Sequence, residues 1–185
     1  MSEQPSLEDE LQKTAEMFVS ALRNRSVRIV FAESCTAGLL AATLSKIPGV
    51  SSSLCGSFVT YRNDSKSSWL GVSDEDLAAP EVGPVSETVA RQMAQGALYK
   101  TPEADLAVSV TGHLGPDAPS QWDGIAFSGI ATRSADSTSV TKFELRSQPE
   151  AGLSLRQTRQ FDAALQVMRN ALTHNSLCPG QAADC

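Results

Sequence analysis

The stretch Val27-Arg28-Ile29-Val30-Phe31-Ala32-Glu33-Ser34-Cys35-Thr36-Ala37-Gly38-Leu39-Leu40 joins a short apolar run to a polar turn and a second apolar segment. Residues 27–32 are rich in β-branched side chains, which predicts a buried strand. Residues 36–47 are rich in Leu and Ala and end at Pro48-Gly49, which predicts a helix. We therefore expect a strand that passes into a helix through Glu33-Ser34-Cys35.

The rest of the chain continues this mixture of helices and strands. Apolar residues at intervals of three and four predict helices over residues 7–22, after Ser86, and over the segment from Phe161 to Leu172. Further elements are expected as strands at 57–61, 106–110, 125–132 and 139–145, and as a short helix through Trp69. The mixture predicts an α/β fold, a three-layer α/β/α sandwich around a central, mostly parallel or mixed sheet.

Length and composition favour one soluble domain. The chain has 185 residues, of which 41% are apolar, enough to bury a sizeable core. We expect the domain to span residues 1–173 and residues 174–185, which lose helical periodicity, to form a mobile tail. No run approaches the roughly 20 apolar residues that span a bilayer, and the acidic N-terminus is unlike a signal peptide, so we expect a cytoplasmic protein without membrane partners.

Charge and cysteine usage narrow the partners further. The net charge of −6 argues against nucleic acid as a partner, because binding phosphates requires clustered Lys and Arg. The four cysteines lack metal-ligand spacing and are expected to be reduced thiols. With His113 and His174 as the only histidines, a histidine-centred metal site or triad has little support, and we expect neither a metal nor a cofactor.

Ser34 is the first candidate for chemistry, because it stands where a buried strand gives way to a helix. Its hydroxyl would lie at the carboxyl edge of the sheet, where α/β folds place ligands, beside backbone N–H groups of the helix start. The same position suits a serine that only caps the helix. From this feature alone, capping is the more common role.

Four blocks of sequence resemble the C-terminal domain of the competence-damage-inducible (CinA) family. Residues 32–40 resemble its Ala-Glu-Ser-Cys-Thr-Gly-Gly signature, and residues 58–66 resemble a strand followed by Tyr-x-Asn-x-x-Lys. Residues 83–86 and 105–116 match two further blocks in the same order, and the resemblance covers residues 7–172. It implies the stand-alone form of this domain, without the family's N-terminal pyrophosphatase domain.

The resemblance implies a nicotinamide-nucleotide amidase, which hydrolyses the carboxamide of nicotinamide mononucleotide to nicotinate mononucleotide and ammonia. Carried over by position, Ser34 would be the nucleophile, Lys66 the general base, and Tyr61 a hydroxyl that assists proton transfer or orients Lys66. The resemblance also implies substrate contacts by residues of these same blocks, and a homodimer or larger homo-oligomer. The implied contact residues are Cys35, Thr36, Gly38, Asn63, Thr111 and Gly112.

This chemistry sets a physical requirement on the lysine. A serine hydroxyl needs a neighbouring base to take its proton, and a lysine can be that base only when it is neutral. Burial would lower the pKa of Lys66, whereas Glu33 or Asp64 beside it would raise that pKa. Backbone N–H groups at the start of the helix after Ser34 could hold the oxyanion. Cys35 is the competing nucleophile, and the resemblance favours Ser34.

The chain departs from the family pattern in two places that bear on specificity. Residues 117–124 replace a glycine-rich stretch, and Ala37 replaces the first glycine of a pair. Arg156 and Arg159 could bind a substrate phosphate, although a structural or solvated role is the commoner one for such residues. Two alternatives to the amidase stay open: a non-enzymatic relative that binds a nucleotide or protein partner, and a serine-dependent hydrolase of another amide.

Overall fold

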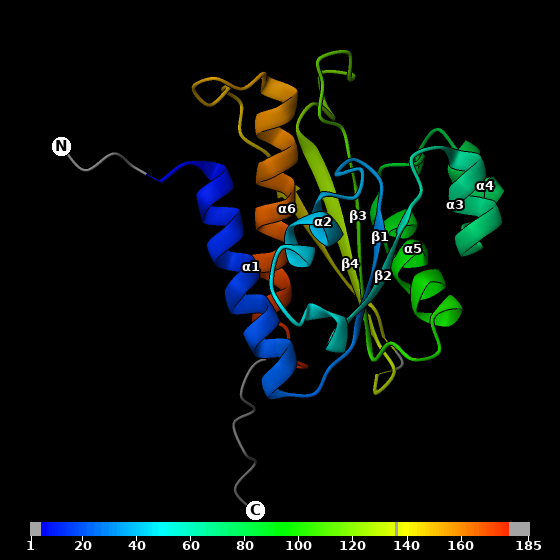
Figure 1. The fold of residues 1–185 in the computed structure, drawn as a ribbon. Helices are drawn as coiled ribbons and strands as arrows, with labels where there is room; N and C mark the ends of the chain where they lie inside the picture. The colour runs from blue at the N-terminus through cyan, green and yellow to red at the C-terminus, as the bar shows by residue number, and fades with distance from the viewer. Residues whose placement is uncertain (1–4, 136, 178–185) are drawn as a thin grey trace, which may run out of the picture.

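A computed structural model describes residues 5–135 and 137–177, and its centre is one five-stranded mixed sheet (Figure 1). The strands are β1 (Ile29–Glu33), β2 (Leu54–Val59), β3 (Leu106–Gly112), β4 (Ile125–Thr132) and β5 (Ser139–Glu144), in the order β2-β1-β3-β4-β5. β1 is parallel to both of its neighbours, whereas β4 and β5 run antiparallel. The central strand β1 therefore ends at an edge that it shares with the carboxyl ends of β2 and β3.

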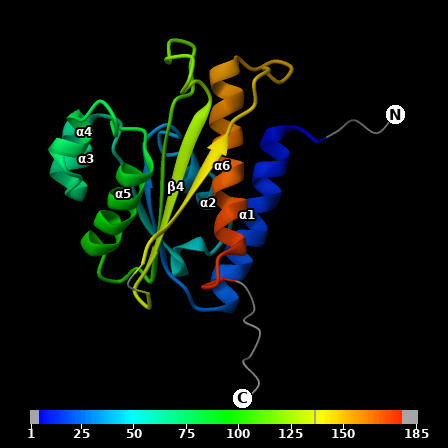
Figure 2. The ribbon, with the colours of Figure 1, turned by 180° about the vertical axis from the view of Figure 1, so that it is seen from behind.

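Helices cover both faces of the sheet, which confirms the predicted three-layer sandwich (Figures 1 and 2). One face carries α1 (Leu7–Asn24), α2 (Leu39–Ser45) and α6 (Leu155–Thr173). The other carries α3 (Asn63–Leu70), α4 (Asp74–Ala78) and α5 (Glu87–Lys100). Within residues 5–135 and 137–177, no helix combines the length and the apolar character that crossing a membrane requires.

Two hydrophobic cores, one on each face of the sheet, fix the direction of the side chains along β1. Phe31 packs in the core with α1 and α6, and Ala32 packs in the core with α5. Since side chains alternate along a strand, Glu33 points toward α2 and the next residue, Ser34, toward α3. The end of β1 thus supplies one functional group to each layer.

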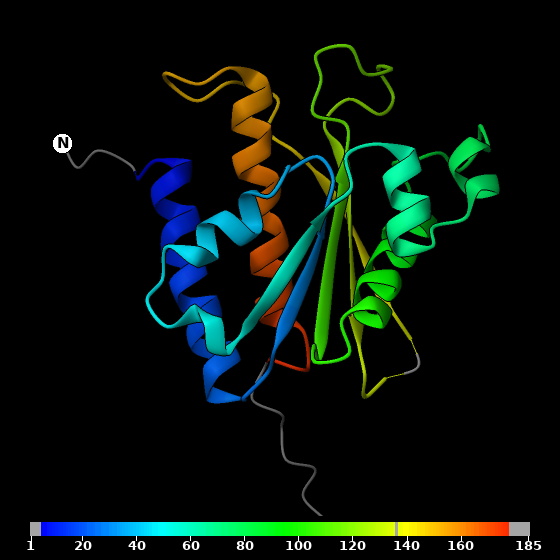
Figure 3. The same cartoon turned by 45° about the vertical axis from the view of Figure 1, so that its right-hand side comes forward.

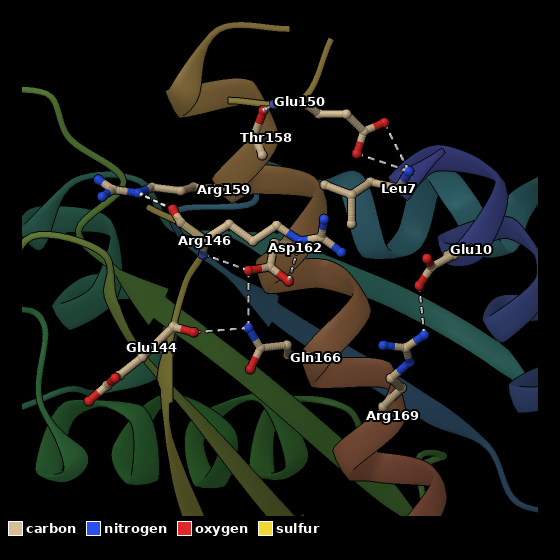
Figure 4. A network of polar contacts seen from close by, with 10 residues as sticks. All are labelled: Leu7, Glu10, Glu144, Arg146, Glu150, Thr158, Arg159, Asp162, Gln166 and Arg169. Carbon is tan, nitrogen blue, oxygen red and sulfur yellow. Dashed lines mark hydrogen bonds and ion pairs between the residues drawn. The ribbon is translucent and has the colours of Figure 1, made fainter. Parts of the chain in front are cut away.

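Polar contacts fasten α6 to α1 and to the segment before it (Figure 4). The Glu150 carboxylate accepts hydrogen bonds from the Leu7 amide at 3.1 and 3.2 Å, and Arg169 pairs with Glu10 at 2.8 Å. Asp162 accepts from the Arg146 amide at 2.8 Å. The start of α6 also bonds the loop that follows β3, because Arg156 donates to the Gly115 carbonyl and Arg159 pairs with Asp123. Both segments lie at the edge where β1 ends (Figure 3).

Element boundaries differ from the sequence expectation around the two turns at this edge. The helix expected from Thr36 begins only at Leu39, because Ala37 and Gly38 have φ values of 53° and 95°, which a right-handed helix excludes. β3 continues through Gly112 instead of ending at Val110, because residues 111 and 112 still pair with β4. α4 was not predicted, since five residues are too few to show helical periodicity.

The expected tail falls partly within the described residues. Residues 174–177 follow α6, and Leu177 is only 4% exposed and packs against the core with α1 and α6. Residues 178–185, with Cys178 and Cys185, lie outside the described residues.

Candidate active site

Ser34 is held at the sheet edge by backbone pairing. Its amide donates to the carbonyl of Val110 on β3 at 3.0 Å, so the residue continues the strand ladder beyond the last residue of β1. The side chain is 8% exposed and faces the layer of α3. On the other side, the carbonyl of the preceding Glu33 accepts from the Thr60 amide at 2.8 Å. Because the backbone is bonded to the segments on both sides, the hydroxyl has a defined position at the carboxyl edge.

Lys66 reaches the same point from the second layer. It lies on α3, is 2% exposed, and its Nζ lies 3.0 Å from Ser34 Oγ. The same nitrogen donates to the Thr60 carbonyl at 2.9 Å, which fixes the side chain from the other side. The structure therefore brings together the serine and the lysine that the sequence separates by 32 positions.

Burial tunes the lysine toward neutrality. Desolvation lowers the pKa of Lys66 from 10.5 to about 8, and the nearby Cys35 acts in the opposite direction. Neither carboxylate considered above pairs with it. Asp64 is exposed and bonds Arg62 at 3.3 Å, and Glu33 points into the other layer. A substantial fraction of the amine is consequently neutral slightly above neutral pH.

Cys35 is the alternative nucleophile, and its environment does not suit that role. It is 5% exposed, and burial raises the pKa of its thiol to about 12, although a hydrogen bond from the Cys35 backbone amide and the nearby Lys66 and Arg156 charges act in the opposite direction. The thiolate is the reactive form of cysteine, so this thiol is unreactive near neutral pH. The sulfur packs close to Gly112, where an added Cβ would lie 3.2 Å from it.

The turn after Ser34 presents backbone N–H groups, but not those that were expected. The first amides of α2 are already used, because Leu40 and Ala41 donate to the Glu33 carboxylate at 3.0 and 3.1 Å. Within the part of the chain that the structure describes, the amides of Cys35 and Thr36 donate to no oxygen atom. The candidate oxyanion donors thus belong to the turn and not to the helix.

Tyr61 is placed by α6 and not by Lys66. It is 56% exposed, and its hydroxyl accepts a hydrogen bond from Arg156 Nη2 at 2.7 Å. Arg156 also donates to the Gly115 carbonyl at 2.6 Å and has no carboxylate partner among the described residues. A guanidinium without a carboxylate partner in the described residues therefore lies beside a phenol, and its charge acts on the neighbouring Cys35 thiol.

The remaining residues that the resemblance implied as substrate contacts differ in whether their polar groups are already hydrogen-bonded. The Thr36 hydroxyl donates to Glu33 at 2.8 Å, and the Thr111 hydroxyl donates to the Pro84 carbonyl at 2.8 Å. Both hydroxyls thus already donate within the protein, Thr36 to a side chain and Thr111 to the backbone. Asn63 is exposed at the start of α3, and Gly38 adopts the left-handed conformation that ends the turn.

The divergent loop after β3 is fixed by a buried arginine. Arg159 is 4% exposed and binds both carboxylate oxygens of Asp123, at 2.7 and 2.8 Å. This pair lowers the pKa of Asp123. Arg159 therefore has the structural role that the sequence favoured. The sequence did not predict a role for Asp123, since its partner Arg159 lies 36 residues further along the chain.

A pocket of about 300 Å³ lies next to this loop. It is lined by residues 77–80 and 82–85, by His113 and by Trp122. Burial lowers the pKa of His113, which favours the neutral ring, although Asp123 acts in the opposite direction. In the described ranges, no group of three His, Cys, Asp or Glu side chains is arranged to hold a metal ion.

Comparison with known proteins gives a consistent family. Residues 11–172 match the model of the CinA C-terminal domain. A protein of Escherichia coli (strain K12) named nicotinamide-nucleotide amidohydrolase PncC is 38% identical over 137 residues, covering 74% of this chain and 81% of that protein. A CinA-like protein of Chloroherpeton thalassium is 38% identical over 151 residues, covering 82% of this chain.

The lengths of these relatives differ. The chain spans only 32–38% of the matching proteins from Caldicellulosiruptor and Chloroherpeton. Among solved structures, the competence/damage inducible protein CihA from Agrobacterium tumefaciens is 31% identical, with a TM-score of 0.76 over 93% of this chain and 98% of that one. The match in sequence and in fold covers Ser34, Lys66 and the elements that hold them, and this chain belongs to the CinA C-terminal domain family.

Proposed function

We propose that this protein is a nicotinamide-nucleotide amidase that converts nicotinamide mononucleotide to nicotinate mononucleotide and ammonia. The observation that carries the proposal is the buried Lys66 amine, 3.0 Å from Ser34 Oγ, with a pKa lowered to about 8. Such a pair can supply a neutral base and a nucleophile in one place. The E. coli relative named for this activity supports the choice of substrate.

The first half of the reaction transfers the acyl group to the enzyme. Neutral Lys66 takes the hydroxyl proton as Ser34 Oγ bonds to the carboxamide carbon, whose oxygen becomes negatively charged. The turn amides of Cys35 and Thr36 donate to that oxygen. When the tetrahedral intermediate collapses, the carbon–nitrogen bond breaks, and Lys66 returns its proton to the leaving nitrogen, which departs as ammonia.

The second half releases the acid. A water molecule gives a proton to Lys66 and attacks the ester carbon of the acyl-enzyme. The bond to Ser34 Oγ then breaks, and Lys66 returns the proton to that oxygen. The enzyme regains its starting state and releases a carboxylic acid, which gives its proton to the ammonia or to solvent and becomes a carboxylate, so one water is consumed for each ammonia released.

The phosphate of the substrate would meet Arg156 and Tyr61. Arg156 carries a charge without a carboxylate partner in the described chain, and Tyr61 places a hydroxyl 2.7 Å from its guanidinium. A guanidinium and a phenol offer several hydrogen bonds to phosphate oxygens. In this arrangement Tyr61 acts on the far end of the substrate, in place of the proton transfer that the resemblance implied.

A second candidate is hydrolysis of another amide, favoured by the divergent loop. Trp122 from this loop lines the 300 Å³ pocket together with His113, where the family pattern has an apolar residue. A substrate that enters this pocket would meet a changed lining, and such a change alters which amide fits. A panel of pyridine and nucleoside carboxamides, each followed by ammonia release, separates this candidate from the first.

The decisive experiment is ammonia release from nicotinamide mononucleotide at pH 8.5, where most of the Lys66 amine is neutral. We expect turnover by the parent protein and a loss of about 10³-fold or more in Ser34→Ala. Cys35→Ala is the matched control, since it removes the neighbouring thiol and is expected to keep turnover within a few-fold of the parent. Normal turnover by a folded Ser34→Ala protein would refute the serine mechanism, and an inactive parent would refute the substrate.

A further inference from the structure

Glu33, the residue before the proposed nucleophile, carries a fully buried carboxylate with four hydrogen-bond donors. Its side chain is 0% exposed. Oε2 accepts from the Thr36 hydroxyl at 2.8 Å and the Leu40 amide at 3.0 Å. Oε1 accepts from the Ala41 amide at 3.1 Å and the Ser57 hydroxyl at 2.9 Å. No cation pairs with this carboxylate among the residues that the structure describes.

These four contacts join three segments around Ser34. Thr36 lies in the turn, Leu40 and Ala41 lie in α2, and Ser57 lies on β2. The carboxylate therefore fixes both ends of the turn that contains the Cys35 and Thr36 amides. It also occupies the amides of α2, so the N–H groups left for a ligand are those of the turn.

We propose that Glu33 is a positioning residue that sets the Ser34 hydroxyl and the turn amides in their reactive geometry. The inference rests on the proposed amidase function, because it concerns how that site is held. Glu33 touches none of the reacting atoms and acts through the turn. A displacement of about 1 Å in such a constellation is enough to lower turnover strongly.

The pattern of donors explains why a carboxylate is needed. Each of its oxygens faces one backbone N–H and one hydroxyl. A glutamine has one acceptor oxygen and one NH₂ group, so in either orientation the NH₂ would oppose the amide of Leu40 or of Ala41. A hydroxyl can turn to accept from that NH₂, but a backbone N–H cannot. Glu33→Gln must therefore break one backbone contact and shift the turn.

The test compares Glu33→Gln with Ser57→Ala. Ser57→Ala removes one of the four donors but leaves the carboxylate and both amide contacts, so we expect kcat to stay within about threefold of the parent. For Glu33→Gln we expect kcat per folded molecule to fall by about tenfold or more, with KM changed less than threefold, because oxyanion contacts strengthen in the transition state. The folded fraction at the assay temperature is taken from the thermal unfolding curve of each protein.

A role limited to stability predicts a different result. Glu33→Gln would then lose folded protein, and the molecules that remain folded would turn over at the parental kcat, which would overturn the proposal. If Glu33→Gln does not fold, Thr36→Val removes one contact between the turn and the carboxylate without changing any charge. An unchanged kcat in Thr36→Val would also overturn the proposal, and a loss of several-fold would support it.

A second readout keeps this proposal separate from the proposed substrate. A fluorophosphonate probe labels activated serines without any amide substrate, and mass spectrometry measures labelling of Ser34. Slower labelling in Glu33→Gln than in the parent and in Ser57→Ala supports the positioning role, even if the parent does not hydrolyse nicotinamide mononucleotide. Equal labelling rates contradict it. A parent that neither hydrolyses nor is labelled overturns both proposals.

Discussion

Two buried ionisable groups, Glu33 and Lys66, flank the end of β1 on opposite layers of the sandwich. They are buried to nearly the same extent, 0% and 2% exposed. Glu33 is surrounded by four donors, whereas among the described residues the Lys66 nitrogen has only the Ser34 hydroxyl and one carbonyl as hydrogen-bond partners. Burial alone therefore does not decide what a charged group does, since the neighbours decide whether the charged form is compensated.

The comparison separates two roles of a buried charged group: Glu33 stabilises a backbone conformation, and Lys66 can change its protonation state. A carboxylate with all its acceptor sites occupied stabilises the turn around it. An amine taken from water without a carboxylate partner loses its proton more readily, and the pKa of Lys66 falls to about 8 for this reason. Consecutive residues of one strand, Glu33 and Ser34, face these two environments because their side chains alternate.

The largest expected effect comes from a permanent positive charge at position 66, which removes the difference in protonation behaviour between Lys66 and Glu33. Lys66→Arg keeps a cation in this position but removes the base, because a guanidinium does not lose its proton in proteins. We expect turnover to fall by about 10³-fold or more at pH 8.5, measured as ammonia release. Lys66→Met, which removes the cation as well, should lose turnover to a similar extent. Substantial activity in Lys66→Arg would contradict a neutral amine as the base.

The second effect is a change of stability with pH. Because the pKa of Lys66 is lowered from 10.5 to about 8 in the folded state, the unfolded chain binds more protons between these values. The penalty for burying the charge is present in full below about pH 8 and is removed as the pH rises toward 10.5. We expect the parent to gain on the order of 3 kcal/mol relative to Lys66→Met over this interval.

Denaturant unfolding at several pH values measures this gain. Lys142→Met, which removes an exposed lysine of β5, controls for the loss of one positive charge. Parallel curves of unfolding free energy for the parent and Lys66→Met would show that burial does not disfavour the charged amine.

The sequence was sufficient for the layers but not for the details of the site. Apolar periodicity located most of the helices and strands, because long amphipathic segments must bury one face. Ser34 and Lys66 could be assigned only through the family resemblance, since no local rule relates positions 32 apart. The hydrogen bond from Arg156 to Tyr61 joins positions 95 apart, and the four donors of Glu33 come from three segments. Both depend on tertiary packing, which local patterns do not encode.

The left-handed turn was also beyond the sequence, because Ala37 is a good helix former that here has a φ of 53°. A glycine would adopt this conformation without a Cβ clash, but it would also give the unfolded chain more freedom.

The smallest expected effect concerns Ala37, and it tests whether the turn held by Glu33 tolerates a more flexible residue. We expect Ala37→Gly to raise the free energy of unfolding by about 0.5 kcal/mol, the net of a relieved left-handed strain and a more flexible unfolded chain. Ser26→Gly is the matched control, since Ser26 also has a φ of 53° and is exposed, but follows α1 far from the turn. Similar gains in both variants, with kcat changed only in Ala37→Gly, would show that the turn affects the reaction through its rigidity. A loss of stability in Ala37→Gly alone would mean that the Ala37 side chain makes contacts that outweigh its backbone strain.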